Sequence, residues 1–232
     1  MNKYPQKTKS DSAIDLVKAG VQLVPFGIGG AITQLYDSFF PVGFEKRKSD
    51  WLKCLAEKLE KLPEEIAMEL SKYLNTEEGK TLLIRAGRSA FSTHKEEKYK
   101  VLRDVLLSSV ADSSIHYDQK EMYMDIISDL EPYDVALLSS IHSNHEKYGK
   151  IESYEEAYKL SLQFGFNGSR DEFILIINKL ENKSLIRITD DIDGFGDVYS
   201  TNAIIDESTS DMPKIKVTEI AIKLVSYITK PV

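Results

Sequence analysis

The amino-acid sequence predicts a mainly α-helical protein, in which an N-terminal helical bundle is followed by a winged-helix-like α+β module. Apolar residues recur at helical spacing throughout residues 44–130. Glu131-Pro132 marks a boundary, because the residue before a proline is disfavoured in the helical region. Beyond it, three helical segments, a β-rich run, an acidic loop, a second β-rich run and a last helix follow in winged-helix order. We therefore expect three parts, over residues 1–44, 45–131 and 132–232.

Five amphipathic helices with short connections make up the predicted bundle. The first, residues 44–62, places Trp51, Leu55 and Leu59 on one stripe and charged side chains on the other face. Pro63 begins the second helix, and Gly79 is expected to end that region. The remaining helices are predicted over residues 81–92, 93–111 and 118–130.

The C-terminal module is predicted from capping residues and β-rich runs. Short helices are expected around 135–141, over 154–164 and over 169–183, the last with Ser169 as N-cap and Glu172 three residues later. Strands are expected at 185–189 and 214–217, and Thr218 begins a helix that extends to Thr229.

The N-terminal part combines a long uncharged run, residues 19–36, with glycines and a proline at its centre. These residues make a continuous membrane span unfavourable and predict a helical hairpin instead. One interpretation is a hairpin buried in the bundle. The other is a hairpin that leaves the bundle and enters an anionic membrane, with basic clusters on both flanks. The candidate membrane or partner contacts are Pro25, Phe26, Gly27, Ile28, Gly29, Gly30, Phe39 and Phe40, with Tyr36 nearby.

Charge is distributed unevenly along the chain. Residues 1–110 hold 18 basic and 15 acidic residues, whereas residues 111–232 hold 12 and 22, which together give the net charge of −7. An acidic module is a poor ligand for a phosphate backbone. On the third predicted helix of the module, we expect Arg170, Glu172, Lys179 and Lys183 to contact a protein rather than duplex DNA. Protein binding or self-association is therefore the expected kind of contact.

Local motifs for catalysis, metals and cofactors are missing from the sequence. The glycines at 27–30 lack the lysine of a phosphate-binding loop, and His142 with His145 lacks further ligands nearby. Cys54 is interpreted as a packing residue or as a residue with no specific role. Lys95, Lys98, Lys100 and Arg103 alternate with acids and are interpreted as a solvated helix face. We expect no catalytic residue, no cofactor and no metal ligand.

Two segments, HKEEKYKVLRDVLLSSVAD (94–112) and MYMDIISDLEPYDVALLSSI (122–141), resemble the central part of bacterial proteins named abortive infection alpha. In that family an aromatic-x-x-Ile-Ile-x-x-Leu-x-Pro-x-Asp-x-x-Leu-Leu pattern follows a leucine-rich helix. The matching residues here are Tyr123, Ile126, Ile127, Leu130, Pro132, Asp134, Leu137 and Leu138. The resemblance implies defence against phage by arrest or killing of the infected cell, and it carries no catalytic residue with it.

The leading hypothesis is a non-enzymatic bacterial anti-phage protein that acts through protein contacts and membrane association. The single cysteine fits a reducing compartment, so the expected location is the cytoplasm, peripheral to the inner membrane when the protein is active. A winged-helix transcription regulator that binds DNA is the alternative. A third hypothesis is an enzyme whose active site is assembled from residues that no local motif identifies.

Overall fold

The computed structural model describes residues 32, 36, 38, 45–148, 154–163, 166–189 and 214–229. This part of the chain is mainly helical with a two-stranded antiparallel sheet, as the sequence predicts. The chain forms two compact units, one of residues 1–132 and 226–232 and the other of residues 133–225.

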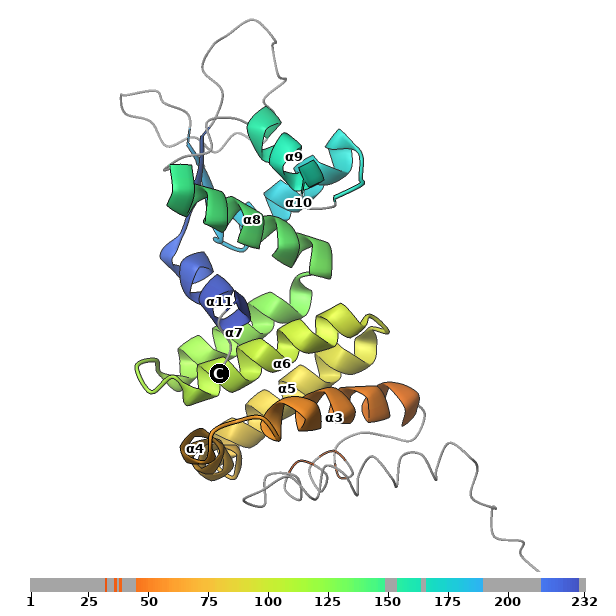
Figure 1. The fold of residues 1–232 in the computed structure, drawn as a ribbon, viewed down its shortest axis with the longest axis vertical. Coiled ribbons are helices and arrows are strands. Elements are labelled where there is room, and N and C mark those ends of the chain that lie inside the picture. The colour runs from red at the N-terminus through yellow and green to blue at the C-terminus, as the bar shows by residue number, and fades with distance from the viewer. Residues whose placement is uncertain are drawn as a thin grey trace, which may run out of the picture. The chain divides into compact units, whose positions relative to one another are not determined.

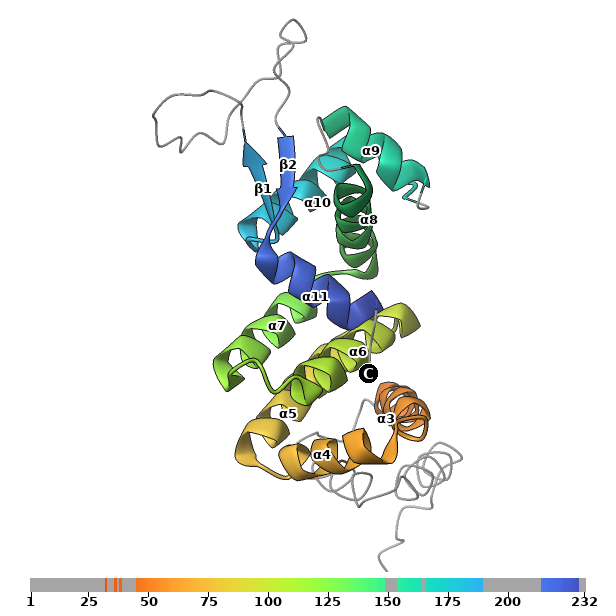
Figure 2. The same cartoon turned by 60° about the vertical axis from the view of Figure 1, so that its left-hand side comes forward.

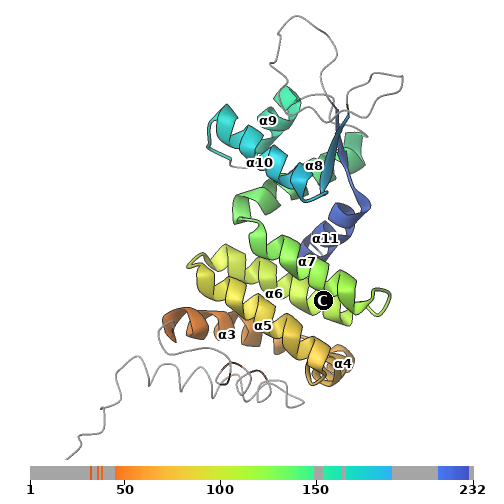
Figure 3. The same cartoon turned by 180° about the vertical axis from the view of Figure 1, so that it is seen from behind.

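Residues 45–129 of the first unit form five consecutive helices (Figures 1 and 3): α3 (Glu45–Leu59), α4 (Glu64–Leu74), α5 (Glu77–Ser92), α6 (Glu96–Ala111) and α7 (Tyr117–Asp129). Helix α6 packs against both α5 and α7, and α3 lies across α5 and α6. The apolar stripes face inward, so that Trp51, Leu82, Leu102 and Ile127 are buried together in the core of this unit. Burial of side chains of this size stabilises each by about 2 kcal/mol.

Helix α5 differs from the prediction because it begins four residues earlier than expected, at Glu77. Thr76 is its N-cap, and its side chain accepts a hydrogen bond from the Gly79 N–H at 3.1 Å. Gly79 therefore lies in the first turn of α5 and does not end a helical region. A Cβ atom at this position would lie 2.2 Å from the Tyr73 carbonyl oxygen, so glycine permits the close approach of α5 to the end of α4.

Helices α6 and α7 form an antiparallel hairpin in which each helix supplies a lysine to the C-terminal end of the other. Lys98, only 3% exposed in the first turn of α6, donates to the carbonyl oxygens of Ile127 at 2.6 Å, Ser128 at 3.0 Å and Leu130. Lys120, near the start of α7, donates to the Val110 carbonyl oxygen at 3.2 Å. A cation at a helix C-terminus satisfies carbonyls that have no intrahelical partner and complements the helix dipole.

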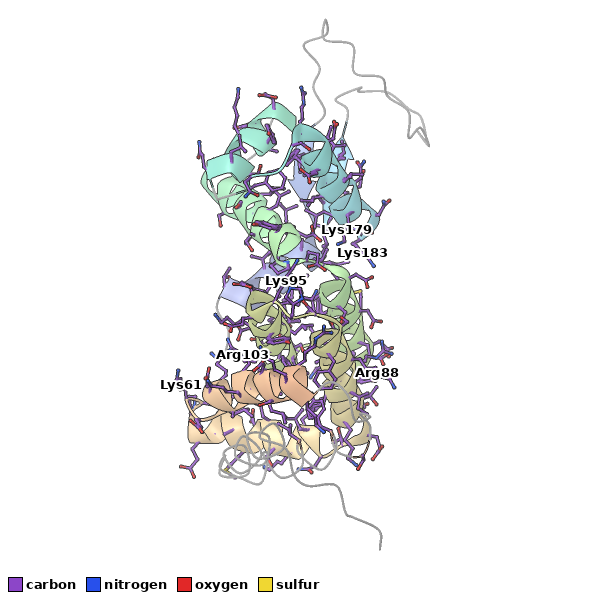
Figure 4. All side chains as sticks on the ribbon, turned by 90° about the vertical axis from the view of Figure 1, so that its right-hand side faces the viewer. Lys61, Arg88, Lys95, Arg103, Lys179 and Lys183 are labelled. Carbon is purple, nitrogen blue, oxygen red and sulfur yellow. The ribbon has the colours of Figure 1, made fainter. Side chains whose placement is uncertain are left out.

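The predicted solvated face of residues 95–103 is therefore wrong for two of its members. Lys98 is buried, and Arg103 is half-buried, with its guanidinium 2.8 Å from the Asp104 carboxylate and 3.5 Å from the Cys54 carbonyl oxygen. Lys95, which pairs with Glu131 at 2.8 Å, is half-exposed, and Lys100 is exposed. Lys95 and Arg103 are labelled in Figure 4.

The second unit begins with α8 (Pro132–Tyr148), which is much longer than the short helix expected around residues 135–141. It continues with α9 (Tyr154–Gln163), α10 (Arg170–Asn182), β1 (Ile186–Thr189), β2 (Lys214–Val217) and the start of α11 (Glu219–Thr229). From Ser226 onward α11 belongs to the first unit, where the Tyr227 hydroxyl donates to the Asp112 carboxylate at 2.9 Å.

The two strands are antiparallel, and their register pairs Ile186 with Val217 and Arg187 with Lys216. Side chains alternate between the two faces of a strand. Ile186 and Ile215 are accordingly buried, whereas Arg187 and Lys216 are exposed. Helix α10 packs against β1 (Figure 2).

Candidate protein-interaction surface

The solvent-facing side of α10 is acidic with one exposed apolar side chain. Phe173, Ile177 and Leu180 are buried and fix the rotation of the helix about its axis. Asp171, Leu175, Asn178 and Glu181 consequently face solvent. Leu175 is 68% exposed, the highest exposed fraction among the large hydrophobic side chains that the structure describes.

Arg170 and Glu172, two of the four residues predicted to contact a partner, stabilise the start of α10. Glu172 and Ser169 form a capping box: the Ser169 N–H donates to the Glu172 carboxylate at 2.7 Å, and the Glu172 N–H donates to the Ser169 hydroxyl at 3.2 Å. The hydrogen bond from the Ser169 backbone lowers the pKa of Glu172 below its usual range. The Arg170 guanidinium lies 3.9 Å from the Glu155 carboxylate of α9, on the surface of the unit.

The other two predicted contact residues lie at the end of α10 (Figure 4). Lys179 reaches Asp134 of α8, with its Nζ atom 2.5 Å from the carboxylate. Asp134 is only 4% exposed, so this ion pair joins α8 to α10 inside the unit. Lys183 is the C-cap residue, and its N–H donates to the Lys179 carbonyl oxygen at 3.1 Å. Glu172 and Lys179 thus have contacts within the unit, and so does Glu181, whose carboxylate accepts a hydrogen bond from the Ile188 N–H of β1 at 3.3 Å. Arg170, Asp171 and Leu175 are exposed on α10.

Sequence reasoning missed Leu175, Arg187 and Lys216. The exposure of Leu175 could have been predicted from the apolar spacing of α10. If Phe173, Ile177 and Leu180 face the core, residue 175 must face solvent. Arg187 and Lys216 alternate with isoleucine and valine in the two β-rich runs, but only the strand register places them directly opposite each other. Like charges in such a cross-strand pair destabilise a sheet.

The predicted membrane or partner contacts Pro25, Phe26, Gly27, Ile28, Gly29, Gly30, Phe39 and Phe40 lie outside the described residues. Of the same N-terminal part, Ile32 and Tyr36 are buried and Ser38 is exposed. The Tyr36 hydroxyl accepts a hydrogen bond from the Trp51 indole N–H at 2.7 Å and donates one to the Leu83 carbonyl oxygen at 3.1 Å. Burial raises the pKa of Tyr36 well above its usual range. Tyr36 is therefore a core residue of the first unit in this structure.

A polar cleft of about 450 Å³ lies at the start of α7. Its walls include Tyr73, Glu78, His116 and Lys120. The Lys120 amine lies 4.4 Å from the centre of the Tyr73 ring and donates a hydrogen bond to the Val110 carbonyl oxygen. Burial lowers the pKa of Lys120. The Tyr73 hydroxyl interacts with the Glu78 carboxylate, and desolvation raises the pKa of Tyr73 to about 12. These contacts join α4 to α5 and α7, and α7 to α6.

The remaining candidate ligands and nucleophiles are not gathered into a site in the described part of the chain. Within these residues, no three His, Cys, Asp or Glu side chains lie close enough to hold a metal ion. Cys54 is partly buried beside Arg103, and desolvation raises the pKa of its thiol, which lowers its reactivity. None of the helices in the described ranges has both the length and the apolar character that a membrane span requires.

Comparisons with models of protein families, with curated proteins and with solved structures find no match to this chain.

Proposed function

We propose that this chain is a non-enzymatic bacterial anti-phage protein of the abortive-infection type, which acts through protein contacts made by α10. The observation that carries the proposal is the open face of this helix. It exposes Leu175 and, about one turn earlier, Asp171, while the amine of Lys179 is held by the buried Asp134. A partly apolar, acidic face suits a protein partner and opposes a phosphate backbone.

The order of elements in the second unit supports a winged-helix-like module within this proposal. Among the described residues, three helices are followed by an antiparallel pair of strands and a last helix. In a winged helix of this order, α10 would take the place of the helix that enters the major groove in DNA-binding members of the class. In this chain the same helix would present carboxylates instead of a basic surface. We therefore infer that the module recognises a protein.

The defence role is supported by the resemblance to the abortive infection alpha family. The residues that carry it have structural roles here: Tyr123, Ile126, Ile127 and Leu130 are buried, and Asp134 pairs with Lys179. These residues build the core of α7 and the start of α8 and do not converge on a reaction centre. The proposal accordingly contains no chemical step.

Membrane association remains part of the proposal for the N-terminal part of the chain. The basic cluster around residues 3–9 suits anionic headgroups. The cluster at 46–48 suits them less than the sequence predicts, because Lys48 is buried and Arg47 donates a hydrogen bond to the Phe91 carbonyl oxygen at 2.7 Å. Because Ile32 and Tyr36 are buried in the first unit, insertion of the hairpin would require the release of this end from the core. A trigger would then be needed to convert a harmless protein into a toxic one.

A phage challenge tests the proposed function. Bacteria that express the wild-type chain should protect a culture from at least one phage of a panel, and Leu175→Asp should abolish the protection without changing the urea midpoint of unfolding. Leu162→Asp, a matched change at another exposed leucine on α9, is the control and should protect as the wild type does. Failure of the wild type against every phage would refute the defence role, and full protection by Leu175→Asp would refute the role of α10.

DNA binding is the second candidate function, and the Arg187–Lys216 pair on the strands favours it. Two exposed cations side by side can neutralise phosphates of a duplex. We expect the full chain to bind duplex DNA no more tightly than micromolar at physiological salt, because α10 is acidic. Fluorescence anisotropy at two salt concentrations measures this. Sub-micromolar affinity that falls steeply with salt and is lost in Arg187→Gln/Lys216→Gln would establish the regulator instead.

A further inference from the structure

Tyr36 contacts helices α3 and α5 in the way that a small ligand contacts its binding site. Its ring is 0% exposed, and the ring centre lies 5.9 Å from that of Phe91 at an interplanar angle of 54°. Its hydroxyl accepts from the Trp51 indole N–H at 2.7 Å and donates to the Leu83 carbonyl oxygen at 3.1 Å. We call the Trp51 indole, the Leu83 carbonyl and the Phe91 ring the Tyr36 site.

The Tyr36 site is specific for a neutral phenol. A phenol hydroxyl accepts one hydrogen bond and donates another, and the site offers one donor and one acceptor to it. A benzene ring without the hydroxyl would leave both of these buried groups without that partner. A phenolate would place a negative charge beside the Leu83 carbonyl oxygen in a buried position, which agrees with the raised pKa of Tyr36.

Tyr36 is held in its site by a short stretch of chain before α3. Among the described residues of that stretch, Ile32 and Tyr36 are buried, whereas Ser38 is exposed. Residues 32 and 36 are helical and four positions apart, so both side chains lie on the same face. The Tyr36 ring and an outside ligand cannot fill the same space. A ligand of the site would therefore shift the equilibrium toward the state in which Tyr36 has left it.

We propose that the Tyr36 site is a regulatory phenol-binding site, in which Tyr36 is the internal ligand and a phenol group from outside the chain displaces it. Displacement frees Ile32 and Tyr36 from the core. The inference rests on the proposed release of the N-terminal part toward a membrane, and it names the chemistry of the trigger. A tyrosine side chain of a partner protein and a free phenolic compound both carry this group.

Thermal unfolding of the full chain tests the specificity of the site. Tyr36→Ala empties the site, and p-cresol, the tyrosine side chain cut at Cβ, should raise the melting temperature of this variant by at least about 2 °C at about 4 mM. Toluene at the same concentration lacks the hydroxyl and should raise it by less than half as much. Phe173→Ala removes another buried ring, which has no hydroxyl. This control should respond no more strongly to p-cresol than to toluene.

Nuclear magnetic resonance of the wild type tests the displacement and does not depend on the folding of Tyr36→Ala. Trp51 is the single tryptophan of the chain, so its indole N–H gives one signal. We expect p-cresol, but not toluene, to shift this signal or to add a second one, and to increase recovery of the protein with anionic vesicles. The same response to N-acetyltyrosinamide would identify a partner's tyrosine as the source, and a response to p-cresol alone would identify a free phenolic compound.

The outcomes separate this inference from the proposed function. The phenol site is wrong if folded Tyr36→Ala responds equally to p-cresol and toluene, or if p-cresol leaves the indole signal of the wild type unchanged. If the indole signal responds while vesicle recovery stays constant, the phenol site stands and the membrane step of the proposed function fails. The phage challenge with Leu175→Asp is decided independently, because Leu175 belongs to the other unit.

Discussion

Replacing Tyr36 with alanine is expected to lower the free energy of unfolding by about 4 kcal/mol, the typical cost of removing a buried aromatic ring. The side chain is 0% exposed, and its ring centre lies 5.9 Å from that of Phe91. Its hydroxyl links the Trp51 indole to the Leu83 carbonyl oxygen. Loss of the ring would leave a cavity and would also leave both polar groups without this partner.

The variant Tyr36→Phe separates the hydrogen bonds from the packing. It retains the ring and is expected to cost about 2 kcal/mol, since a buried donor and a buried acceptor both lose the hydroxyl. Trp51 is the single tryptophan of the chain, so its fluorescence reports both the local change and the urea transition. Tyr133→Phe, at a half-exposed tyrosine, is the matched control and should change stability by less than about 0.5 kcal/mol. Equal midpoints for Tyr36→Phe and the wild type would contradict the role of the hydroxyl.

The same substitution bears on the proposed membrane step. If Ile32 and Tyr36 must leave the core before the N-terminal segment enters a bilayer, Tyr36→Ala lowers the cost of release. Sedimentation with anionic vesicles should then recover a larger fraction of Tyr36→Ala than of the wild type, and the excess should be absent with neutral vesicles. Equal recovery of the two proteins with both kinds of vesicle would count against a membrane-active hairpin.

Substitution of Lys98 by methionine is expected to cost about 3 kcal/mol, although a lysine-to-methionine change on a solvated helix is nearly neutral. Methionine preserves most of the apolar stem but removes the amine that holds the carbonyl oxygens of Ile127, Ser128 and Leu130. The end of α7 would then lose its cap in a buried setting. For a chain of this size, the melting temperature should fall by about 6–12 °C.

Lys100→Met provides the matched control, because Lys100 lies two residues away on the same helix and is exposed. Its melting temperature should stay within about 2 °C of the wild type. Thermal unfolding followed by circular dichroism compares the two variants under identical conditions. If both substitutions have the same small effect, Lys98 does not cap α7, and the sequence-based interpretation of a solvated face would be correct after all.

The type and order of the helices could be predicted because hydrophobic periodicity reports which face of a segment is buried. The stripe through Trp51, Leu55 and Leu59 and the capping box at Ser169 and Glu172 are both local patterns, and both are present in the structure. Boundaries were less predictable. The periodicity of α5 begins at its first buried leucines, whereas the helix itself starts at the cap, Thr76.

The roles of charged residues could not be predicted in the same way. Lys98 and Lys100 are alike in sequence context, yet one is buried against the end of α7 and the other is exposed. Lys179 was expected to contact a partner, but its amine is held by Asp134, 45 residues earlier in the chain. Which group a charged side chain contacts depends on which helices lie next to each other in the folded protein. The spacing of residues along the sequence does not determine this.

The sequence by itself determined the mainly helical class, the order of the elements and the acidic character of the second half, because these depend on composition and on neighbours within one or two helical turns. Only the tertiary structure decided that Tyr36 belongs to the core, that Lys98 and Lys120 close the α6–α7 hairpin, and that Arg187 faces Lys216. Each of these contacts joins residues that are far apart in the sequence. The contact forms only when helix packing or strand register brings the two residues together.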